Sequence, residues 1–499
     1  MDSRRPVIVG VGQITQRSAD PTAGKGVIDL MADSLELAAA DTGITAAAAA
    51  IQLVGSISSM SQRYQNAARL VADRVGATSA TTLQCGVGGN TPLQLLGLLA
   101  HEIQNGDLDA AAIVGAEAFA TTRALRKADL RREWPTEVTP NEPDRRLGDD
   151  TLGASALEAS CGLIPPASMY PLLENAVRHH SGRTITEHQR VIAALWSRFS
   201  DVGASNPAAW SPGFKDPDFL AQQSADNRPT AFPYTKWLNA NMGVDQGAAL
   251  IICSTEWADK MGIAAHRRVY PLAVANANDH WIVSTRPHLH VSPAIRAAAS
   301  LATQLARTSA DDATYIDIYS CFPVAVELAA SALGLQLDDP RGLTVTGGLT
   351  FAGGPGNNYV THSLARLVEL LRDAPSGTTA LATGLGWYAT KHSVGYLSNR
   401  PSDQPFTHGS AQTAVDHESQ PLHVDPDYLG PAHVVTNTVV FDRDGEPTST
   451  IALLDTPQGT RTLATSPAKD LAGLAVDDAF IGSAISVRTI DGNRELALS

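Results

Sequence analysis

Cys85 occupies the position in this sequence that best suits covalent chemistry. It follows the predicted strand Thr81–Gln84 and opens a loop that leads into a helix predicted from about Thr91. A thiol just before a helix N-terminus faces the positive end of the helix dipole, which lowers its pKa, and a thiolate there can accept an acyl group as a thioester. The loop glycines would let a substrate approach the sulfur; they are Gly86, Gly88 and Gly89. A small buried cysteine in a strand-to-helix turn is the alternative interpretation.

Three further candidates for chemistry lie in the second half of the chain. Tyr319 ends the predicted buried strand Tyr315–Tyr319, at the end of an α/β sheet where functional side chains are common. Cys321 follows two residues later and either approaches the same pocket or packs in the core. His392 offers an imidazole from a different direction. Packing or hydrogen bonding to a neighbour is the alternative role for each of them.

Metal and dinucleotide sites are not predicted. His179 and His180 are adjacent, so on a helix they point about 100° apart and do not converge on one ion. The loop Gly86–Asn90 lacks the G-x-G-x-x-G spacing of a dinucleotide site. The four cysteines contain no C-x-x-C pair. This pattern favours a reducing compartment, so we expect a cytoplasmic protein without structural zinc or a disulfide framework.

Composition and charge exclude several classes of partner. The 499 residues are 43% hydrophobic and 18% charged, which suits a large folded core. A net charge of −14 disfavours binding to nucleic acid or to an anionic membrane surface. The most membrane-like stretch, residues 46–57, is shorter than the roughly 18 apolar residues that a spanning helix needs. We therefore expect neither nucleic acid nor membrane as a partner.

Alternating strand-like and helix-like segments predict an α/β architecture with two similar halves. One series begins at Val7–Gly12 and a second at Val269–Ala275, and each places a glycine-rich loop before a helix roughly eighty residues later. We expect an N-terminal half at 1–265 with an irregular insertion at about 121–235, and a C-terminal half at 266–400.

The end of the chain has a different character. Residues 401–420 are polar and are predicted to be a linker. Short alternating strands separated by tight turns then predict a small antiparallel β-barrel at 421–499, similar to an OB-fold. We expect this barrel to fold autonomously, to dock on the core and to shape access to its pocket, because it has no tryptophan and few basic residues with which to bind nucleic acid.

Five segments occur in the order found in the thiolase superfamily, which the chain resembles over about residues 5–398. They are Pro6–Gly12, the Cys85 loop, Asp245–Ala249, Asp317–Phe322, and Gly347–Leu349 with Gly353–Pro355. The additional barrel makes the chain similar to thiolase-like proteins type 1, a group near the sterol carrier protein X-type thiolases. The resemblance implies two βαβαβαββ halves in five αβαβα layers. Family thiolases pair through a core strand near the cysteine loop, so a homodimer is expected, or a monomer if the barrel covers that surface.

The resemblance also implies a ligand and the residues that hold it. Cys85 falls where thiolases carry their acyl-accepting cysteine, so the implied ligand is a coenzyme A thioester, with no covalently bound cofactor and no metal. Gly353 and Gly354 fall in the segment that lines the ligand site. A basic cluster in the insertion is either a solvated face or a site for coenzyme A phosphates; it contains Arg123, Arg126, Lys127, Arg131 and Arg132.

Three departures from the family pattern bear on activity. Gly354 replaces the histidine of a G-H-P motif, Ala382-Thr383-Gly384 lacks the cysteine of a C-x-G motif, and Tyr319 replaces the histidine of an H-D-C-F-type segment. Ordinary thiolysis and Claisen condensation are therefore not expected. We predict an acyltransferase of lipid metabolism that is not a standard thiolase and acts through Cys85. The alternatives are a non-catalytic acyl-CoA-binding or scaffold protein, and a tyrosine-dependent C–C lyase (retro-aldolase) acting on 3-hydroxyacyl-CoA.

Overall fold

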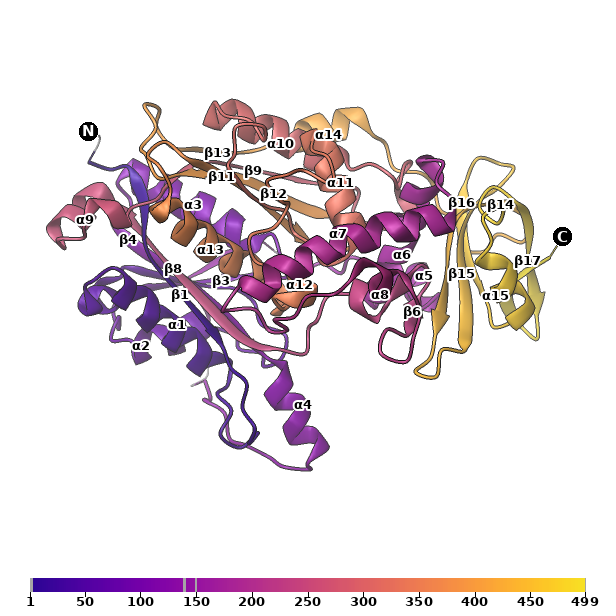
Figure 1. Cartoon of the computed structure of the whole chain (residues 1–499), viewed down its shortest axis with the longest axis horizontal. Coiled ribbons are helices and arrows are strands. Elements are labelled where there is room, and N and C mark those ends of the chain that lie inside the picture. Colours follow the sequence, from indigo (N-terminus) through magenta and orange to yellow (C-terminus); the bar gives the residue numbers. More distant parts are fainter. Residues whose placement is uncertain (1–2, 138–140, 149, 499) are drawn as a thin grey trace.

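A computed structural model describes residues 3–137, 141–148 and 150–498 of the chain. Two β-sheets with helices between and outside them form the core, and a barrel stands at one end (Figure 1). Within these described ranges, no helix combines the length and apolar character needed to cross a membrane.

The first sheet has six strands whose order is not the chain order. The order is β1 (Pro6–Thr15), β8 (Asp245–Ser254), β4 (Ala110–Ala118), β2 (Leu53–Ser56), β3 (Thr81–Cys85) and β5 (Arg145–Leu147). Strand β8 is antiparallel to both of its neighbours, whereas β4, β2, β3 and β5 run parallel. Small and aliphatic residues fill β4 and β8, which are buried along their whole length. Helices α1 (Val27–Asp41) and α2 (Ala67–Arg74) cover the outer face of this sheet.

The second sheet is built by the C-terminal half. Its order is β10 (Tyr315–Asp317), β11 (Thr379–Gly386), β12 (Lys391–Ser398), β9 (Tyr270–Asn278) and β13 (Thr407–Ser410). Helices α10 (Pro293–Ala306) and α11 (Pro323–Leu333) lie on its outer face, and the short helix α9 (Thr255–Lys260) joins the two halves.

Two helices form the middle layer between the sheets. Helix α3 (Thr91–Asn105) and helix α13 (Tyr359–Asp373) contact each other and strands of both sheets. Both are mostly buried and apolar, since each must pack on two sheets at once. The predicted five-layered fold is thereby confirmed.

The insertion lies mainly at the barrel end of the core. It contains α4 (Phe119–Lys127), α5 (Ala156–Ser160), α6 (Pro166–His180), α7 (Ile185–Ser205), α8 (Pro217–Ala221), β6 (Pro229–Ala231) and β7 (Tyr234–Thr235). Thr184 caps α7 through a capping box with Glu187. Helix α7 then packs on α11 and on α12 (Gly348–Phe351), where Gly203 allows close approach because a Cβ there would lie 2.9 Å from that of Phe351.

The C-terminal strands close into a five-stranded barrel, as predicted. The ring contains β14 (Gly430–Phe441), β15 (Pro447–Asp455), β16 (Arg461–Ser466), β18 (Asn493–Ala497) and β17 (Ala484–Ile490), with α15 (Lys469–Ala475) packed on it. Apolar residues from these strands and α15 form its own core. The barrel is not wholly antiparallel, because β16 and β18 pair in parallel through Thr465 and Glu495.

The barrel also shares structure with the insertion. Strand β6 extends β14 at the pair Val440 and Ala231. The Thr436 hydroxyl donates to the Leu172 carbonyl at 2.6 Å, and the Asn175 amide donates to the Asn437 carbonyl at 2.8 Å, both in buried surroundings. These backbone and side-chain hydrogen bonds join the barrel to the insertion, so the barrel does not stand apart from the core.

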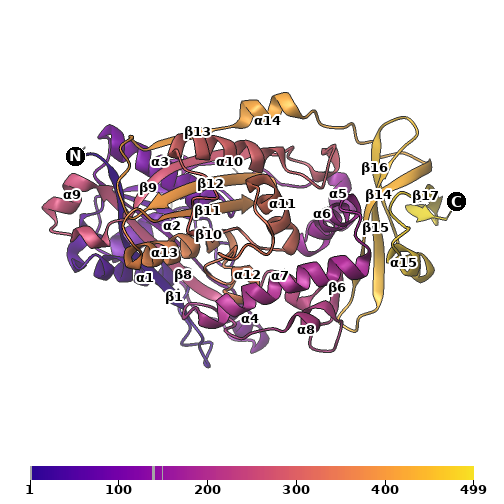
Figure 2. The same cartoon turned by 45° about the horizontal axis from the view of Figure 1, so that its top comes forward.

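The predicted linker at 401–420 is wrong, because much of it is regular structure in the core. Strand β13 runs parallel to β9, from Thr407 opposite Ala273 to Ser410 opposite Asn276. Helix α14 (Gln412–Glu418) follows and packs on α10 and β9, as Figure 2 shows along the upper edge of the molecule. An edge strand with one partner tolerates polar residues, so polarity did not reveal it.

Candidate functional site

Three chain segments meet the loop that follows Cys85. The Gly88 N–H donates to Asn357 Oδ1 at 3.0 Å. A Cβ placed on Gly89 would lie 2.5 Å from the Tyr319 hydroxyl, and one on Gly384 would lie 2.8 Å from Asn90 Cα. Only glycine permits this close approach of the loops. The segments that the resemblance assigned to the site are therefore neighbours in space, and we call this region the Cys85 junction.

The Cys85 thiol is deeply buried, with 2% of the residue exposed. Burial raises the pKa of Cys85 to about 12, which contradicts the lowered pKa expected from the helix dipole. Helix α3 begins only at Thr91, and dipole effects fall off within the first turn of a helix. In the structure Cys85 is therefore a neutral thiol at physiological pH.

Backbone contacts and a threonine hydrogen bond hold the two segments in which the family pattern has a histidine and a cysteine. The Gly354 N–H donates to the Asn241 carbonyl at 2.9 Å. Gly353 has a φ of 110°, and a Cβ there would lie 2.1 Å from Gln246 Oε1, so this position requires glycine. Thr383 Oγ1 accepts the Tyr319 N–H at 2.9 Å. These residues fix the loops in place and supply neither an imidazole nor a thiol.

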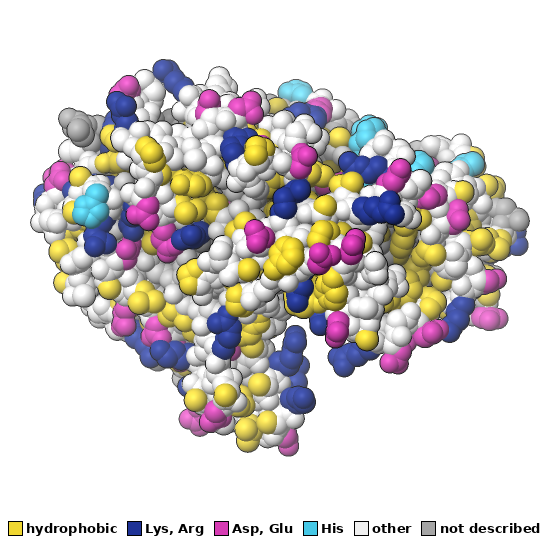
Figure 3. Space-filling view, in the orientation of Figure 1, with side chains coloured by type: hydrophobic (Ala, Val, Ile, Leu, Met, Phe, Trp, Pro, Cys, Tyr) yellow, Lys and Arg dark blue, Asp and Glu magenta, His cyan; other side chains and the backbone are white. Residues whose placement is uncertain are grey.

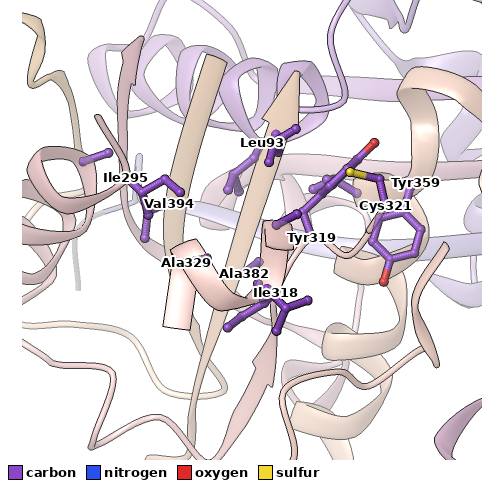
Figure 4. Packing of buried hydrophobic residues seen from close by; sticks show 14 of the residues in the cluster. Leu93, Ile295, Ile318, Tyr319, Cys321, Ala329, Tyr359, Ala382 and Val394 are labelled. Carbon is purple, nitrogen blue, oxygen red and sulfur yellow. The ribbon is translucent and has the colours of Figure 1, made fainter. Parts of the chain in front are cut away.

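Tyr319 is a buried, neutral phenol that packs edge-on against Tyr359, with ring centroids 5.4 Å apart. Figure 4 shows these two rings grouped with Cys321. Burial, together with Cys321, raises the pKa of Tyr319 well above its ordinary value. Burial also raises the pKa of Cys321 to about 12. Tyr319 is thus suited to donating a hydrogen bond or a proton, and Cys321 is a packed thiol.

His392 is buried beside a carboxylate that the sequence analysis missed. Its Nε2 lies 3.4 Å from Asp279 Oδ2. Asp279 also accepts the Ser292 hydroxyl and, at 3.1 Å, the Ala294 N–H. Burial pushes the pKa of Asp279 upward, but contacts with His392, Arg286 and Ser292 hold it below its ordinary value. Asp279 follows β9 directly, and a polar residue at the end of a buried strand was the available signal.

His392 lies between two cavities. One is a void of about 10 Å³ that it shares with Tyr319, Thr383 and Ser393. The other is an open cavity of about 330 Å³ whose walls include Asn90, Asn276, Trp281 and Lys391. The small void holds at most one water. The structure therefore places Tyr319 and His392 around one space, with the larger cavity on the other side of the imidazole.

Arg123 and Arg126 are exposed on α4, outside the Cys85 junction. Arg123 lies against the turn at Gly243, where a Cβ would be 3.3 Å from its guanidinium. The same turn contains Asn241, whose carbonyl holds Gly354. In Figure 3 basic side chains follow one side of the projection that α4 forms. Arg123 is thus linked to the junction through one turn, whereas no described contact brings Arg126 to it.

Sequence analysis also missed a buried cluster of Glu174, His188 and Glu327. The His188 Nε2 lies 2.6 Å from Glu174 Oε1. The three residues come from α6, α7 and α11, and no local spacing links them.

Comparisons with known proteins support the fold assignment. Residues 411–493 match the family model for the thiolase-like protein type 1 additional C-terminal domain. A crystal structure of a monomeric SCP2-thiolase like protein type 1 from Mycobacterium smegmatis is 32% identical with a TM-score of 0.85, and the match covers 100% of both chains. No curated protein sequence matches the chain.

Two more distant structures share the fold of the core. The Ltp2-ChsH2(DUF35) aldolase has a TM-score of 0.60 at 16% identity. The dimeric peroxisomal thiolase of Saccharomyces cerevisiae has a TM-score of 0.57 at 13% identity. Each match covers 80% of this chain and 98% of the other.

Proposed function

The chain belongs to the SCP2-thiolase-like protein type 1 family, and from this premise we propose that it binds a coenzyme A thioester at the Cys85 junction without thiolase activity. The observation that carries the proposal is that the loops of the junction are assembled around a buried thiol with a raised pKa. Thiolysis needs a thiolate and a second acid–base group. Gly354 and Ala382 stand where the family pattern has the histidine and the cysteine.

The surroundings of the junction support binding of a thioester. The cavity of about 330 Å³ beside His392 is within the size range of small-molecule sites. Its wall includes Asn90, which ends the loop that follows Cys85. Arg123, and Arg126 on the same exposed helix face, would hold the phosphates. No covalently bound cofactor is needed for this role.

Calorimetry with acetyl-CoA and coenzyme A tests the proposal, combined with a thiolysis assay on a 3-ketoacyl-CoA. We expect binding without thiolysis. Arg123→Ala should weaken binding by about twofold to fivefold, the scale of an exposed charge contact. Arg190→Ala, which removes an exposed arginine on α7, is the matched control and should leave binding unchanged. Thiolysis, or absence of binding, would contradict the proposal.

A tyrosine-dependent C–C lyase is the second candidate, favoured by the void that Tyr319 and His392 share. In such a cleavage His392, oriented by Asp279, accepts the hydroxyl proton of a 3-hydroxyacyl thioester. The C2–C3 bond then breaks to give a carbonyl product and a thioester enolate, and Tyr319 protonates C2 of the enolate. Product analysis by mass spectrometry tests this role, since Tyr319→Phe and His392→Gln should each abolish cleavage while retaining ligand binding.

Acyl transfer to Cys85 is the function that the sequence favoured, and the buried neutral thiol weighs against it. Intact mass spectrometry after incubation with acyl-CoA separates this case from the other two. An adduct that is lost in Cys85→Ala would establish Cys85 as an acyl acceptor and remove the non-catalytic assignment.

We also propose that the protein is a monomer in the cytoplasm. Strand β5 pairs with the edge of β3, the strand next to the cysteine loop, so that edge is covered within the chain. The similar protein from Mycobacterium smegmatis is described as monomeric. All four cysteines are free and buried, which suits a reducing compartment. Light scattering of the purified protein tests the monomer.

A further inference from the structure

Three helices bring two carboxyl groups and an imidazole together outside the Cys85 junction. Glu174 lies on α6, His188 on α7 and Glu327 on α11, and all three side chains are buried. One potential ligand atom from each lies within 4.8 Å of the other two. The His188 Nε2 is 2.6 Å from Glu174 Oε1 and 3.8 Å from Glu327 Oε2. The proposed function uses none of these groups.

A second observation concerns Glu327 Oε2. Among the residues that the structure describes, none donates a hydrogen bond to this atom, although the Glu327 side chain is only 5% exposed; the atom faces His188. A buried carboxylate oxygen without a partner is costly, and two buried carboxyl groups at this separation repel when both are charged. A shared proton or a cation at the centre of the cluster would relieve this repulsion.

Neighbouring side chains form hydrogen bonds to the cluster, and a surface hollow lies beside it. The Tyr234 hydroxyl donates to Glu174 Oε2 at 2.5 Å. Arg183 donates to Glu327 Oε1 at 3.2 Å, and the same nitrogen lies 3.3 Å from His188 Nδ1. The Arg183 side chain is 32% exposed and, with Glu327, lines a surface hollow of about 390 Å³. His180 and His290 stack in the wall of that hollow.

We propose that Glu174, His188 and Glu327 bind a divalent transition-metal ion such as Zn²⁺. One imidazole nitrogen and two carboxylate oxygens are a donor set that Zn²⁺ accepts, with metal–ligand distances of about 2.0–2.2 Å. Ligand atoms on such a tetrahedral site are roughly 3.4 Å apart, a value between the 2.6 and 3.8 Å separations around His188 Nε2. Water from the hollow would take the fourth position.

Binding requires a defined rearrangement of protons. In the metal-free protein the Arg183 donor faces His188 Nδ1, so the imidazole proton is on Nε2. Metal binding moves this proton to Nδ1, and any proton held between the two carboxyl groups leaves to solvent. Arg183 must then rotate into the hollow, because its N–H would otherwise face an N–H. The bound ion would tie α6 and α7 of the insertion to α11 of the core.

The test uses the full-length protein after dialysis against a chelator, titrated with Co²⁺ and then Zn²⁺. We expect one Co²⁺ per chain, seen by its visible absorption, displacement by Zn²⁺, and a rise in Tm. His188→Gln and Glu327→Gln should lose the Co²⁺ absorption, whereas His180→Ala should keep it. Absence of binding to the folded protein, or loss of binding in His180→Ala, would overturn the proposal.

Arg183→Met tests the proposed metal site even if the variants of the buried ligands fail to fold. It leaves all three ligands in place and removes a cation and a donor that oppose the metal. Metal binding should tighten by about tenfold, the effect of removing one nearby like charge at the protein surface. Unchanged or weaker binding in folded Arg183→Met would show that the cluster is an ion-pair network and not a metal site.

Discussion

The Cys85 junction and the Glu174–His188–Glu327 cluster both contain buried ionisable groups, but they differ in the charged and hydrogen-bonding neighbours of these groups. At the junction no charged group of the described part of the chain offsets the burial of the thiol, so its pKa rises to about 12 and the group is neutral. In the cluster, two carboxyl groups, an imidazole, a phenol and a guanidinium share hydrogen bonds. Acid–base groups are thus sparse around the thiol where the thiolase pattern would place them and concentrated where the insertion meets the core.

Burial alone explains part of this contrast. It lowers the pKa of His188 to about 4, although Glu327 opposes the shift, and it raises the pKa of both carboxyl groups. Hydrogen bonds join most groups of the cluster, whereas the groups of the junction remain uncharged. The following changes test this contrast.

Removal of the barrel should have the largest effect. It should destabilise mainly helix α6, which carries Glu174 of the cluster. A chain ending at Gln420 keeps β13 and α14 but loses β14, which buries Leu172 and Asn175 of α6. We expect loss of hydrogen-exchange protection throughout α6, with α3 at the junction still protected. Equal loss of protection in both helices would show that the two regions form one cooperative unit.

Alkylation of Cys85 should be strongly suppressed. A pKa of about 12 against an ordinary value of 9 lowers the thiolate fraction about 10³-fold near neutral pH. Mass spectrometry of iodoacetamide-treated peptides measures this rate, with the denatured protein as the reference. Labelling of Cys85 in the native protein at the rate of a free thiol would show that a nearby base activates the thiol. The difference between the junction and the cluster would then not hold.

Glu174→Leu should destabilise the protein by about 3 kcal/mol. It leaves the Tyr234 hydroxyl and the His188 Nε2 proton without an acceptor in a buried site, and each orphaned donor costs about 1–3 kcal/mol. Urea unfolding measures the change. Glu36→Leu on the exposed face of α1 is the control and should shift stability by no more than about 0.5 kcal/mol. A loss for Glu174→Leu as small as the control would mean that the cluster contributes nothing to folding.

His362 offers a reference for an imidazole that is buried without a charged partner. Its Nδ1 lies 3.0 Å from Gln13 Oε1, and burial lowers its pKa to about 3. Because the unfolded chain binds the proton more readily, stability should fall as pH decreases from about 6.5 towards 3. The contribution is at most about 1.4 kcal/mol per pH unit, so roughly 2 kcal/mol is lost between pH 6 and pH 4.5.

Unfolding curves at several pH values check this reference, with His362→Gln for comparison. The variant should show a flatter pH dependence than the wild-type protein over that window. Parallel curves for the two proteins would rule out His362 as the source.

Gly354→His should have the smallest effect. A Cβ at Gly354 lies 3.4 Å from the Asn241 carbonyl, an ordinary contact, so an imidazole can begin there without a clash. If it approaches Cys85, the thiol pKa falls and alkylation increases by about tenfold, equivalent to one pKa unit. An unchanged rate would mean that burial, and not the missing histidine, keeps the thiol neutral.

The sequence allowed the fold to be predicted but only part of the site. Alternating segments, glycine-rich loops and turn residues are local signals, and they identified the two halves, the barrel and the position of Cys85. The protonation state of Cys85 could not be predicted because burial depends on packing from distant segments. Glu174 and Glu327 could not be connected because only the packing of α6 on α11 brings them together.

The position of β8 between β1 and β4 has a consequence for synthesis on the ribosome. Strand β1 ends at Thr15, but its partner begins at Asp245 and ends at Ser254. At about 5–20 residues per second, β1 waits roughly 10–50 s for that partner to emerge. During this interval β1 and β4 expose unpaired edges, which are templates for aggregation. Newly made chains therefore depend on α1, whose apolar face packs on β1, or on chaperones to protect these edges until β8 arrives.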